Sequence, residues 1–120
     1  METLIQAEPR PLCRVDEIDD GSARGFPPAP GGFNGIVAYR KGDAIHVYVN
    51  SCPHIGTPLD WTPNRFMSRD GKYIICATHG AAFAPATGEC LLGPCEGDYL
   101  DKVKFEVKDG VIFVPADAGL

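Results

Sequence analysis

The sequence predicts an all-β domain built from short antiparallel strands. Over the 120 residues, no run of 12 has apolar residues at helical spacing without an interrupting proline or glycine. Instead, runs rich in β-branched and aromatic residues alternate with turns, and two pairs of runs are joined by the hairpin-type connections Lys41-Gly42-Asp43 and Lys108-Asp109-Gly110. A chain of this length is expected to form one domain, residues 1–120, around its own core.

The first half of the chain is predicted to contain three strands. Alternation over residues 12–18 predicts an opening strand, which ends at a turn over residues 19–22. Residues 22–35 contain three prolines and four glycines, so we expect a surface loop there. The β-rich runs 36–40 and 44–49 are predicted to pair as a hairpin.

The second half is predicted to contain a short strand and a final hairpin. Residues 73–75 are expected to form the strand, and residues 82–84 lead into a turn at residues 86–88. Residues 102–107 and 111–114 flank an Asp-Gly turn of the type favoured in hairpins, so we expect them to pair.

Composition and charge exclude several classes of function. With 16 acidic against 11 basic residues and a formal charge of −5, the chain lacks the basic face that nucleic acid requires. Its basic cluster, Lys102, Lys104 and Lys108, is interpreted as a solvated strand face. No apolar run approaches the roughly 20 residues of a membrane-spanning helix, and no export signal is evident, so a cytoplasmic location is expected.

Two short motifs, Cys52-Pro53-His54 and Cys76-Ala77-Thr78-His79, are the candidate metal ligands, and each follows a predicted strand. Each motif offers one soft thiolate and one imidazole. A Rieske [2Fe–2S] centre needs both kinds of ligand, because one of its irons takes two cysteines and the other takes two histidines. Two cysteines and two histidines also satisfy tetrahedral zinc, so a zinc site is the alternative.

These residues resemble the Rieske iron–sulfur family, over roughly residues 36–114. Besides the two ligand pairs, the resemblance includes Gly80, the Thr87-Gly88 turn, and Gly93-Pro94, which is similar to the family's proline loop. It implies a Rieske-type antiparallel β sandwich or barrel of three small sheets, with a two-loop cluster-binding tip. The ligand loops would span about residues 50–61 and 76–84, and the proline loop about residues 90–96.

The resemblance also implies one Rieske-type [2Fe–2S] cluster as cofactor and assigns its ligands. Cys52 and Cys76 would bind the inner iron, whereas His54 and His79 would bind the outer iron near solvent. No catalytic residue is expected in this chain, because a Rieske oxygenase also needs a mononuclear iron site with two histidines and a carboxylate. His46 is the one histidine that remains, and we expect a surface or hydrogen-bonded strand residue there.

Four residues depart from the high-potential respiratory members of that family. Where those proteins have a second, bridging cysteine in each loop, this chain has Thr57 and Thr78. Where they have a serine and a tyrosine whose hydroxyls donate to the cluster and its cysteine sulfur, this chain has Ala81 and Phe83. Such donors stabilise the reduced cluster, so a reduction potential toward the low end of the Rieske range is expected.

Three cysteines and the segment between the ligand pairs are left over. Cys13, Cys90 and Cys95 are expected to be buried thiols, with a Cys90–Cys95 disulfide as the alternative. The 21 residues from Ile55 to Ile75 are more than ferredoxins of this family usually have, and the excess is expected to lengthen a solvated hairpin. Trp61 is expected to pack beneath the first loop.

The resemblance implies a soluble, low-potential electron carrier rather than an enzyme. Such a Rieske-type ferredoxin would pass single electrons from a reductase to a terminal enzyme such as an oxygenase. The alternative is a small accessory subunit that stays bound to a larger oxidoreductase. An electron carrier needs a modest docking patch near its cluster. Its expected apolar members are Ile55, Pro58, Leu91, Leu92 and Pro94.

Overall fold

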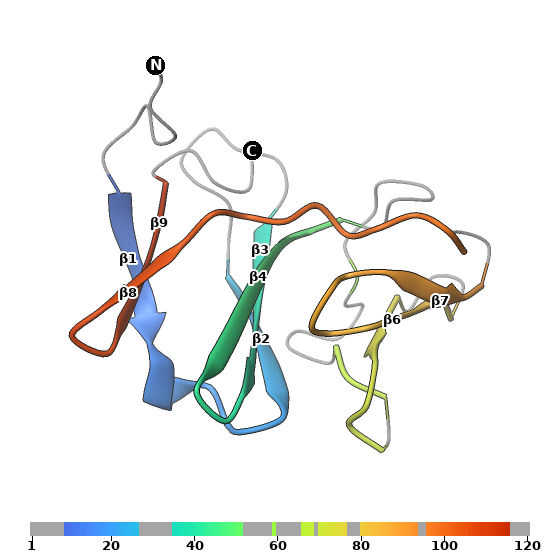
Figure 1. Cartoon of the computed structure of the whole chain (residues 1–120), viewed down its shortest axis with the longest axis horizontal. Helices are drawn as coiled ribbons and strands as arrows, with labels where there is room; N and C mark the ends of the chain where they lie inside the picture. The colour runs from blue at the N-terminus through green and yellow to red at the C-terminus, as the bar shows by residue number, and fades with distance from the viewer. Residues whose placement is uncertain are drawn as a thin grey trace.

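A computed structural model of the chain describes residues 9–26, 35–51, 59, 66–68, 70–76, 80–93 and 96–115. In these residues nine strands form three antiparallel sheets of three strands each, and no α-helix is present (Figure 1). The strands are β1 (Pro9–Arg14), β2 (Ser22–Phe26), β3 (Gly35–Lys41), β4 (Ala44–Asn50), β5 (Ile74–Ile75), β6 (Ala82–Phe83), β7 (Cys90–Leu92), β8 (Glu106–Lys108) and β9 (Val111–Pro115). The predicted all-β class and three small sheets are confirmed.

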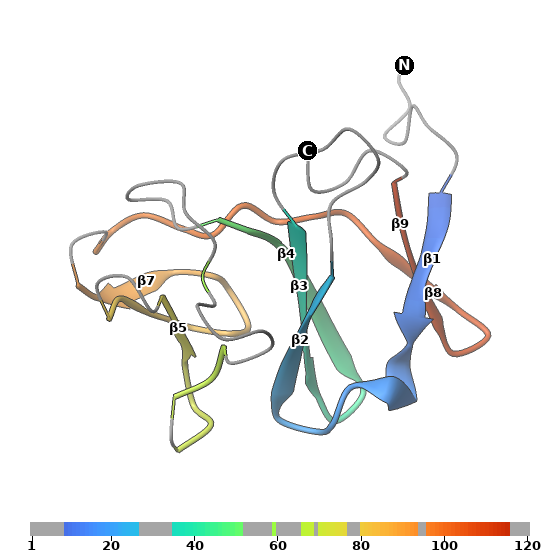
Figure 2. The same cartoon turned by 180° about the vertical axis from the view of Figure 1, so that it is seen from behind.

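The three sheets stand in a row, with β2-β3-β4 between the other two (Figures 1 and 2). On one side lies the sheet of order β1-β9-β8, and on the other lies β5-β6-β7. The predicted hairpin of β3 and β4 is confirmed, with pairing that runs from Gly35 opposite Asn50 to Lys41 opposite Ala44. Gly42 turns this hairpin in the left-handed conformation, at φ +60°, which glycine adopts without strain.

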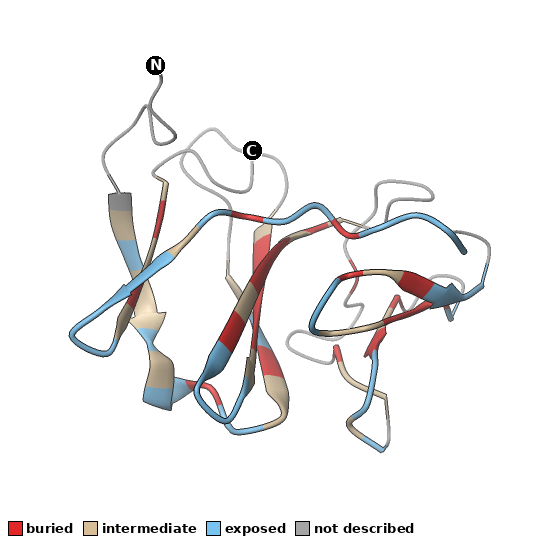
Figure 3. Ribbon diagram, viewed as in Figure 1, coloured by how far each residue is buried: buried red, intermediate tan, exposed pale blue. Residues whose placement is uncertain are grey.

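The middle sheet lies between two apolar cores, one on each face. Figure 3 shows buried residues along β3 and β4. Successive side chains of a strand point to opposite faces, so Ile36 and Ala38 enter one core while Val37 and Tyr39 enter the other. All four residues are buried, which explains why β3 reads as a continuous apolar run. This sheet therefore joins the two outer sheets through separate cores.

The two cores differ in what they enclose. The first joins the middle sheet to β1-β9-β8 and consists of Ile18, Ile36, Ala38, Ile45, Val47, Val103, Ile112 and Val114. The second joins the middle sheet to β5-β6-β7 and consists of Ala23, Val37, Tyr39, Tyr48, Leu59, Phe66, Ile74, Cys76, Ala81, Phe83, Cys90 and Leu100. The second core, here called the cluster-side core, contains the predicted ligand Cys76.

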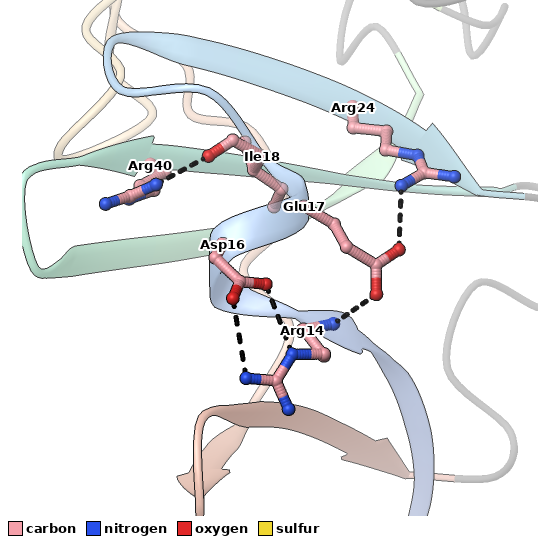
Figure 4. A network of polar contacts seen from close by, with 6 residues as sticks. All are labelled: Arg14, Asp16, Glu17, Ile18, Arg24 and Arg40. Carbon is pink, nitrogen blue, oxygen red and sulfur yellow. Dashed lines mark hydrogen bonds and ion pairs between the residues drawn. The ribbon is translucent and has the colours of Figure 1, made fainter.

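The beginning of the chain differs from the prediction of one strand over residues 12–18. Strand β1 starts at Pro9 and pairs with β9, and after Arg14 the chain forms a 3-10 turn over Val15–Glu17. Glu17 holds this corner by accepting a hydrogen bond from the Arg14 N–H (3.1 Å) and another from Arg24 on β2 (3.2 Å), as Figure 4 shows. The acidic residues of this segment, Asp16 and Glu17, therefore stabilise a turn that connects two sheets.

The prediction of a loop over residues 22–35 was wrong for its first part. Residues 22–26 form β2, which pairs with β3 from Ser22 opposite Arg40 to Phe26 opposite Ile36. The Arg40 guanidinium also donates a 2.9 Å hydrogen bond to the Ile18 carbonyl just ahead of β2 (Figure 4). An edge strand tolerates Gly25 because pairing with β3 supplies the order that local propensity does not.

The last hairpin is shorter than predicted, since β8 covers Glu106–Lys108 rather than residues 102–107. Residues 101–103 run beside β4 instead: the Val49 N–H donates to Asp101 and the Val103 N–H donates to Val47. Asp109 and Gly110 both have positive φ, +53° and +77°, as the favoured two-residue hairpin turn requires. Lys102, Lys104 and Lys108 are exposed, as predicted.

Among the described residues, no helix is long and apolar enough to cross a membrane.

Tyr48 connects the middle sheet to the turn that follows β6. Its side chain is 1% exposed, and its hydroxyl donates a 2.6 Å hydrogen bond to the Pro85 carbonyl. Gly88, at φ +80°, lies so close that an added Cβ would be 2.9 Å from a Tyr48 ring carbon. Burial raises the pKa of Tyr48 to about 12, because the phenolate would lose its hydration.

The Tyr48 hydroxyl predicts a stability loss at alkaline pH. Its pKa is about 12 in the folded protein against 10.0 normally. The protonated hydroxyl therefore contributes to the free energy of unfolding below pH 10, and this contribution is lost as pH rises toward 12. Tyr48→Phe should cost about 1 kcal/mol at neutral pH, because the Pro85 carbonyl loses its donor. Denaturant unfolding between neutral pH and pH 12 should show a smaller alkaline loss in Tyr48→Phe, and equal losses would contradict this account.

Candidate metal centre

The structure describes one of the four predicted ligands, Cys76. Cys52, His54 and His79 lie outside the described residues, as do Thr57, Thr78, Trp61, Ile55, Pro58, Pro94 and Cys95. Accordingly, the described part of the chain contains no group of three or more His, Cys, Asp and Glu side chains able to hold a metal ion. What the structure does describe is the framework on both sides of each ligand loop.

The second ligand loop is closed by the backbone of its own ends. Cys76 follows β5 directly, and its N–H donates to the Ala81 carbonyl at 2.8 Å. Its carbonyl in turn accepts from the Gly80 N–H at 2.8 Å. Gly80 has φ +70°, a conformation that residues with a Cβ rarely adopt, so glycine suits this position. These two bonds hold the ends of the second loop together, and His79 belongs to the segment between Cys76 and Gly80.

The first ligand loop begins at the end of β4 and is fixed by two other contacts. After Asn50, the Ser51 N–H donates back to the Val49 carbonyl at 2.8 Å, which ends the strand. The Asn50 side-chain oxygen then accepts a hydrogen bond from the Leu59 N–H, also at 2.8 Å. Leu59 is fully buried in the cluster-side core. Cys52 and His54 belong to the segment between these two anchors.

The two loops end in the same core. Leu59 from the first loop and Cys76, Ala81 and Phe83 from the second all belong to the cluster-side core, and each is 0% exposed. Ala81 and Phe83 offer no hydroxyl, so the departures predicted to lower the potential lie in an apolar, water-excluded setting. Cys76 places a sulfur donor in these surroundings, and an iron–sulfur cluster fits such a donor.

The segment after β7 lies directly on the second ligand loop. Cys90–Leu92, the first residues of the expected proline loop at about residues 90–96, form strand β7. Pro94 and Cys95 lie outside the described residues. Gly93, at φ +106°, lies so close to Ala81 that an added Cβ would be 2.8 Å from the Ala81 Cα. Such contact needs glycine at this position. The sequence shows Gly93-Pro94 but not what it touches, since Ala81 is far away along the chain.

The described residues outside the predicted ligand set include two cysteines and one histidine, and each packs within the fold. Cys13 is half-buried against the core of the β1-β9-β8 side, not fully buried as predicted, and burial raises the pKa of its thiol. Cys90 is buried, and its sulfur donates to the Leu92 carbonyl at 3.4 Å. Half-buried His46 stacks on Tyr39 with ring centroids 6.2 Å apart, and burial together with Lys102 lowers its pKa.

An apolar groove opens beside the second ligand loop. It is lined by Tyr73, Ile75, Gly80, Ala82, Leu91 and Leu92. Leu91 and Leu92 are 41% and 64% exposed, in agreement with the prediction that they belong to a surface patch. Tyr73 and Ile75 were not predicted as members, although they flank fully buried Ile74 at strand spacing, which places them together on its opposite face.

The family model for the Rieske [2Fe–2S] domain matches residues 8–110. The chain belongs to this family. Membership implies one Rieske-type [2Fe–2S] cluster as its cofactor.

Individual relatives agree with this assignment. The Rieske chain is 28% identical to the ferredoxin CarAc of Metapseudomonas resinovorans over 107 residues, or 88% of this chain and 92% of that protein. It also resembles a chain in a solved complex of reduced oxygenase and oxidized ferredoxin in carbazole 1,9a-dioxygenase, with TM-score 0.70 and 27% identity over 93% of this chain and 96% of that one.

A third comparison supports the fold alone. The ferredoxin of carbazole 1,9a-dioxygenase from Nocardioides aromaticivorans IC177 matches with TM-score 0.69 and 22% identity, over 91% of this chain and 98% of that one. This chain therefore has a fold similar to that of this ferredoxin.

The close approach of Gly93 and Ala81 predicts a large cost for a side chain at position 93. Gly93→Ala should lower the free energy of unfolding by about 3 kcal/mol, from steric overlap with Ala81 and from left-handed backbone strain. Gly97 is the matched control, because it has a similar φ of +97° and nothing within 4 Å of an added Cβ. Gly97→Ala should cost about 1 kcal/mol, from backbone strain alone. Equal losses in denaturant unfolding would refute the contact.

Proposed function

We propose that this protein is a low-potential Rieske-type electron carrier whose [2Fe–2S] cluster is held by Cys52, His54, Cys76 and His79. The observation that carries the proposal is the family match combined with two mixed Cys/His motifs whose loops end in one apolar core. When bound, the cluster supplies one-electron oxidation and reduction. Cys52 and Cys76 would hold one iron, and His54 and His79 the other.

The protein's own residues would tune and shield the cluster. Buried Leu59, Ala81 and Phe83 exclude water from the base of the two loops. Because Ala81 and Phe83 carry no hydroxyl, their side chains cannot donate hydrogen bonds that would stabilise a reduced cluster. The potential is therefore expected toward the low end of the Rieske range, which runs from roughly −150 to +300 mV.

The proposed acceptor is a terminal oxygenase, and the proposed donor is a reductase. The similar structure with 27% identity comes from a complex of oxygenase and ferredoxin, which supports this class of partner. The groove beside Gly80 is the proposed docking surface, because it is apolar and borders the loop that contains His79. From Tyr73 to Asp101 the chain has four carboxylates and neither lysine nor arginine, so a partner surface with basic residues around an apolar contact fits it.

An electron carrier of this kind has no catalytic residues of its own. The alternative of a permanent accessory subunit has less support, because the match covers 92% of a protein named as a ferredoxin. We further propose that it works in the cytoplasm. The Cys13 thiol forms no disulfide, as expected in a reducing compartment.

Metal and sulfide analysis tests the proposed cofactor. The purified protein should be reddish-brown and contain two irons and two acid-labile sulfides per chain, with an EPR signal that appears on reduction. His79→Ala should abolish that signal, because the outer iron loses a ligand. A colourless protein with one zinc per chain, or an unaltered spectrum in the variant, would contradict the proposal.

The docking surface predicts that Leu92 matters for electron transfer to an oxygenase. The probe is the oxygenase of carbazole 1,9a-dioxygenase, and the rate is followed by stopped-flow absorbance of the cluster. Leu92→Asn should slow transfer about fivefold, as expected for losing roughly 1 kcal/mol of apolar contact. Val107→Asn is the matched control, since Val107 is 47% exposed on β8, in the sheet on the other side of the molecule. Equal effects of the two substitutions, or no transfer from the unmodified protein, would count against this surface.

A further inference from the structure

Asn50 is an unusual residue in the described part of the chain, because it is strongly polar and yet buried. It is 9% exposed and stands at the end of β4, opposite Gly35 on β3. A buried amide is costly unless it is hydrogen-bonded, so its partners indicate its role. The partner of its side-chain oxygen is the N–H of Leu59, at 2.8 Å, and this bond is itself buried.

The bond connects two points that are nine residues apart along the chain. Asn50 is fixed by the β3–β4 pairing, and Leu59 is fixed by complete burial in the cluster-side core. The segment between them contains Cys52 and His54. The Asn50–Leu59 bond therefore closes the first ligand loop at its base.

The second ligand loop needs no side chain for the same purpose. There the Cys76 carbonyl accepts from the Gly80 N–H, and the Cys76 N–H donates to the Ala81 carbonyl, so backbone groups close the loop. The first loop is longer, and the Leu59 N–H is satisfied by the amide of Asn50. If that acceptor is removed, a buried N–H is left without a partner, and the loop can open.

We infer that Asn50 is a positioning residue for the cluster: its side-chain oxygen holds the Leu59 N–H, and this closes the loop that presents Cys52 and His54. The inference rests on the proposed cluster ligands. Asn50 acts through loop geometry and contributes no ligand of its own. Its removal should therefore alter cluster retention and the cluster spectrum more than it alters the rest of the fold.

Two variants separate positioning from general stability. Asn50→Leu keeps the approximate volume but removes the acceptor. Ile112→Val is the control, because Ile112 is fully buried in the other core, and deleting a methylene there destabilises the fold away from both loops. Each holoprotein is mixed with an iron chelator, and iron release is measured together with the EPR spectrum of the reduced protein.

Asn50→Leu should release iron about tenfold faster than the unmodified protein, which corresponds to about 1.4 kcal/mol, and its EPR g values should shift. Ile112→Val should stay within about twofold and keep the original spectrum. The inference is wrong if Asn50→Leu also stays within twofold, or if Ile112→Val accelerates release equally.

Hydrogen exchange of the unmodified holoprotein gives a test that needs no variant to fold. The Leu59 amide should be protected like amides of the β3–β4 ladder, and rapid exchange there would overturn the inference. Iron analysis distinguishes the two levels of failure. An unmodified protein without iron would overturn the proposed function together with this inference, whereas an iron-containing protein with an exchangeable Leu59 amide would overturn the inference alone.

Discussion

The double burial of the middle sheet is the constraint on which the rest of the structure depends. Ile36 and Ala38 of β3 point into one core, and Val37 and Tyr39 point into the other. A polar residue at any of these four positions would face apolar side chains without water on either side. The outer sheets, with two to six residues per strand, have little core of their own, so they depend on the faces that β2-β3-β4 offers.

This constraint also determines where the ends of the two proposed ligand loops are anchored. Strand β4 ends at Asn50, and Leu59 returns the chain to the cluster-side core after the first ligand loop. Cys76 and Ala81 anchor the second loop in the same core. Two loops that are remote in sequence thus share one apolar base, while the groove of Tyr73, Leu91 and Leu92 remains exposed beside them. Such a division suits an electron carrier, which must shield its cluster on one side and approach a partner on the other.

The sequence predicted features that depend on local chemistry. The β3–β4 and β8–β9 hairpins follow from their glycine-containing turns, and the all-β class follows from the strand-forming runs. Strand β2 was missed because its order comes from pairing with β3, whereas the prolines and glycines that follow it in the sequence indicated a loop. The length of β8 was overestimated because residues 101–103 pair with β4. The alternation of apolar and polar residues cannot reveal which strand a segment pairs with.

Some residues of the candidate site could also be predicted from the sequence, whereas others could not. The Cys/His motifs, Ala81 and Phe83 could be picked out from residue type and spacing, and the exposed Leu91 and Leu92 were expected in the patch. Asn50 and Gly93 were not predicted in their roles, because the partner of each is a backbone group reached only in the folded chain. Tyr73 was within reach of the sequence, since it alternates with the buried Ile74.

Pulsed EPR of the reduced protein tests the central claim of mixed ligation most directly. Two histidines on one iron predict modulation from two strongly coupled nitrogens in the spectrum of the cluster. A cluster without strongly coupled nitrogen would mean that all four ligands are cysteines or other groups. That result would contradict the assignment of His54 and His79, and with it the account of the two loops.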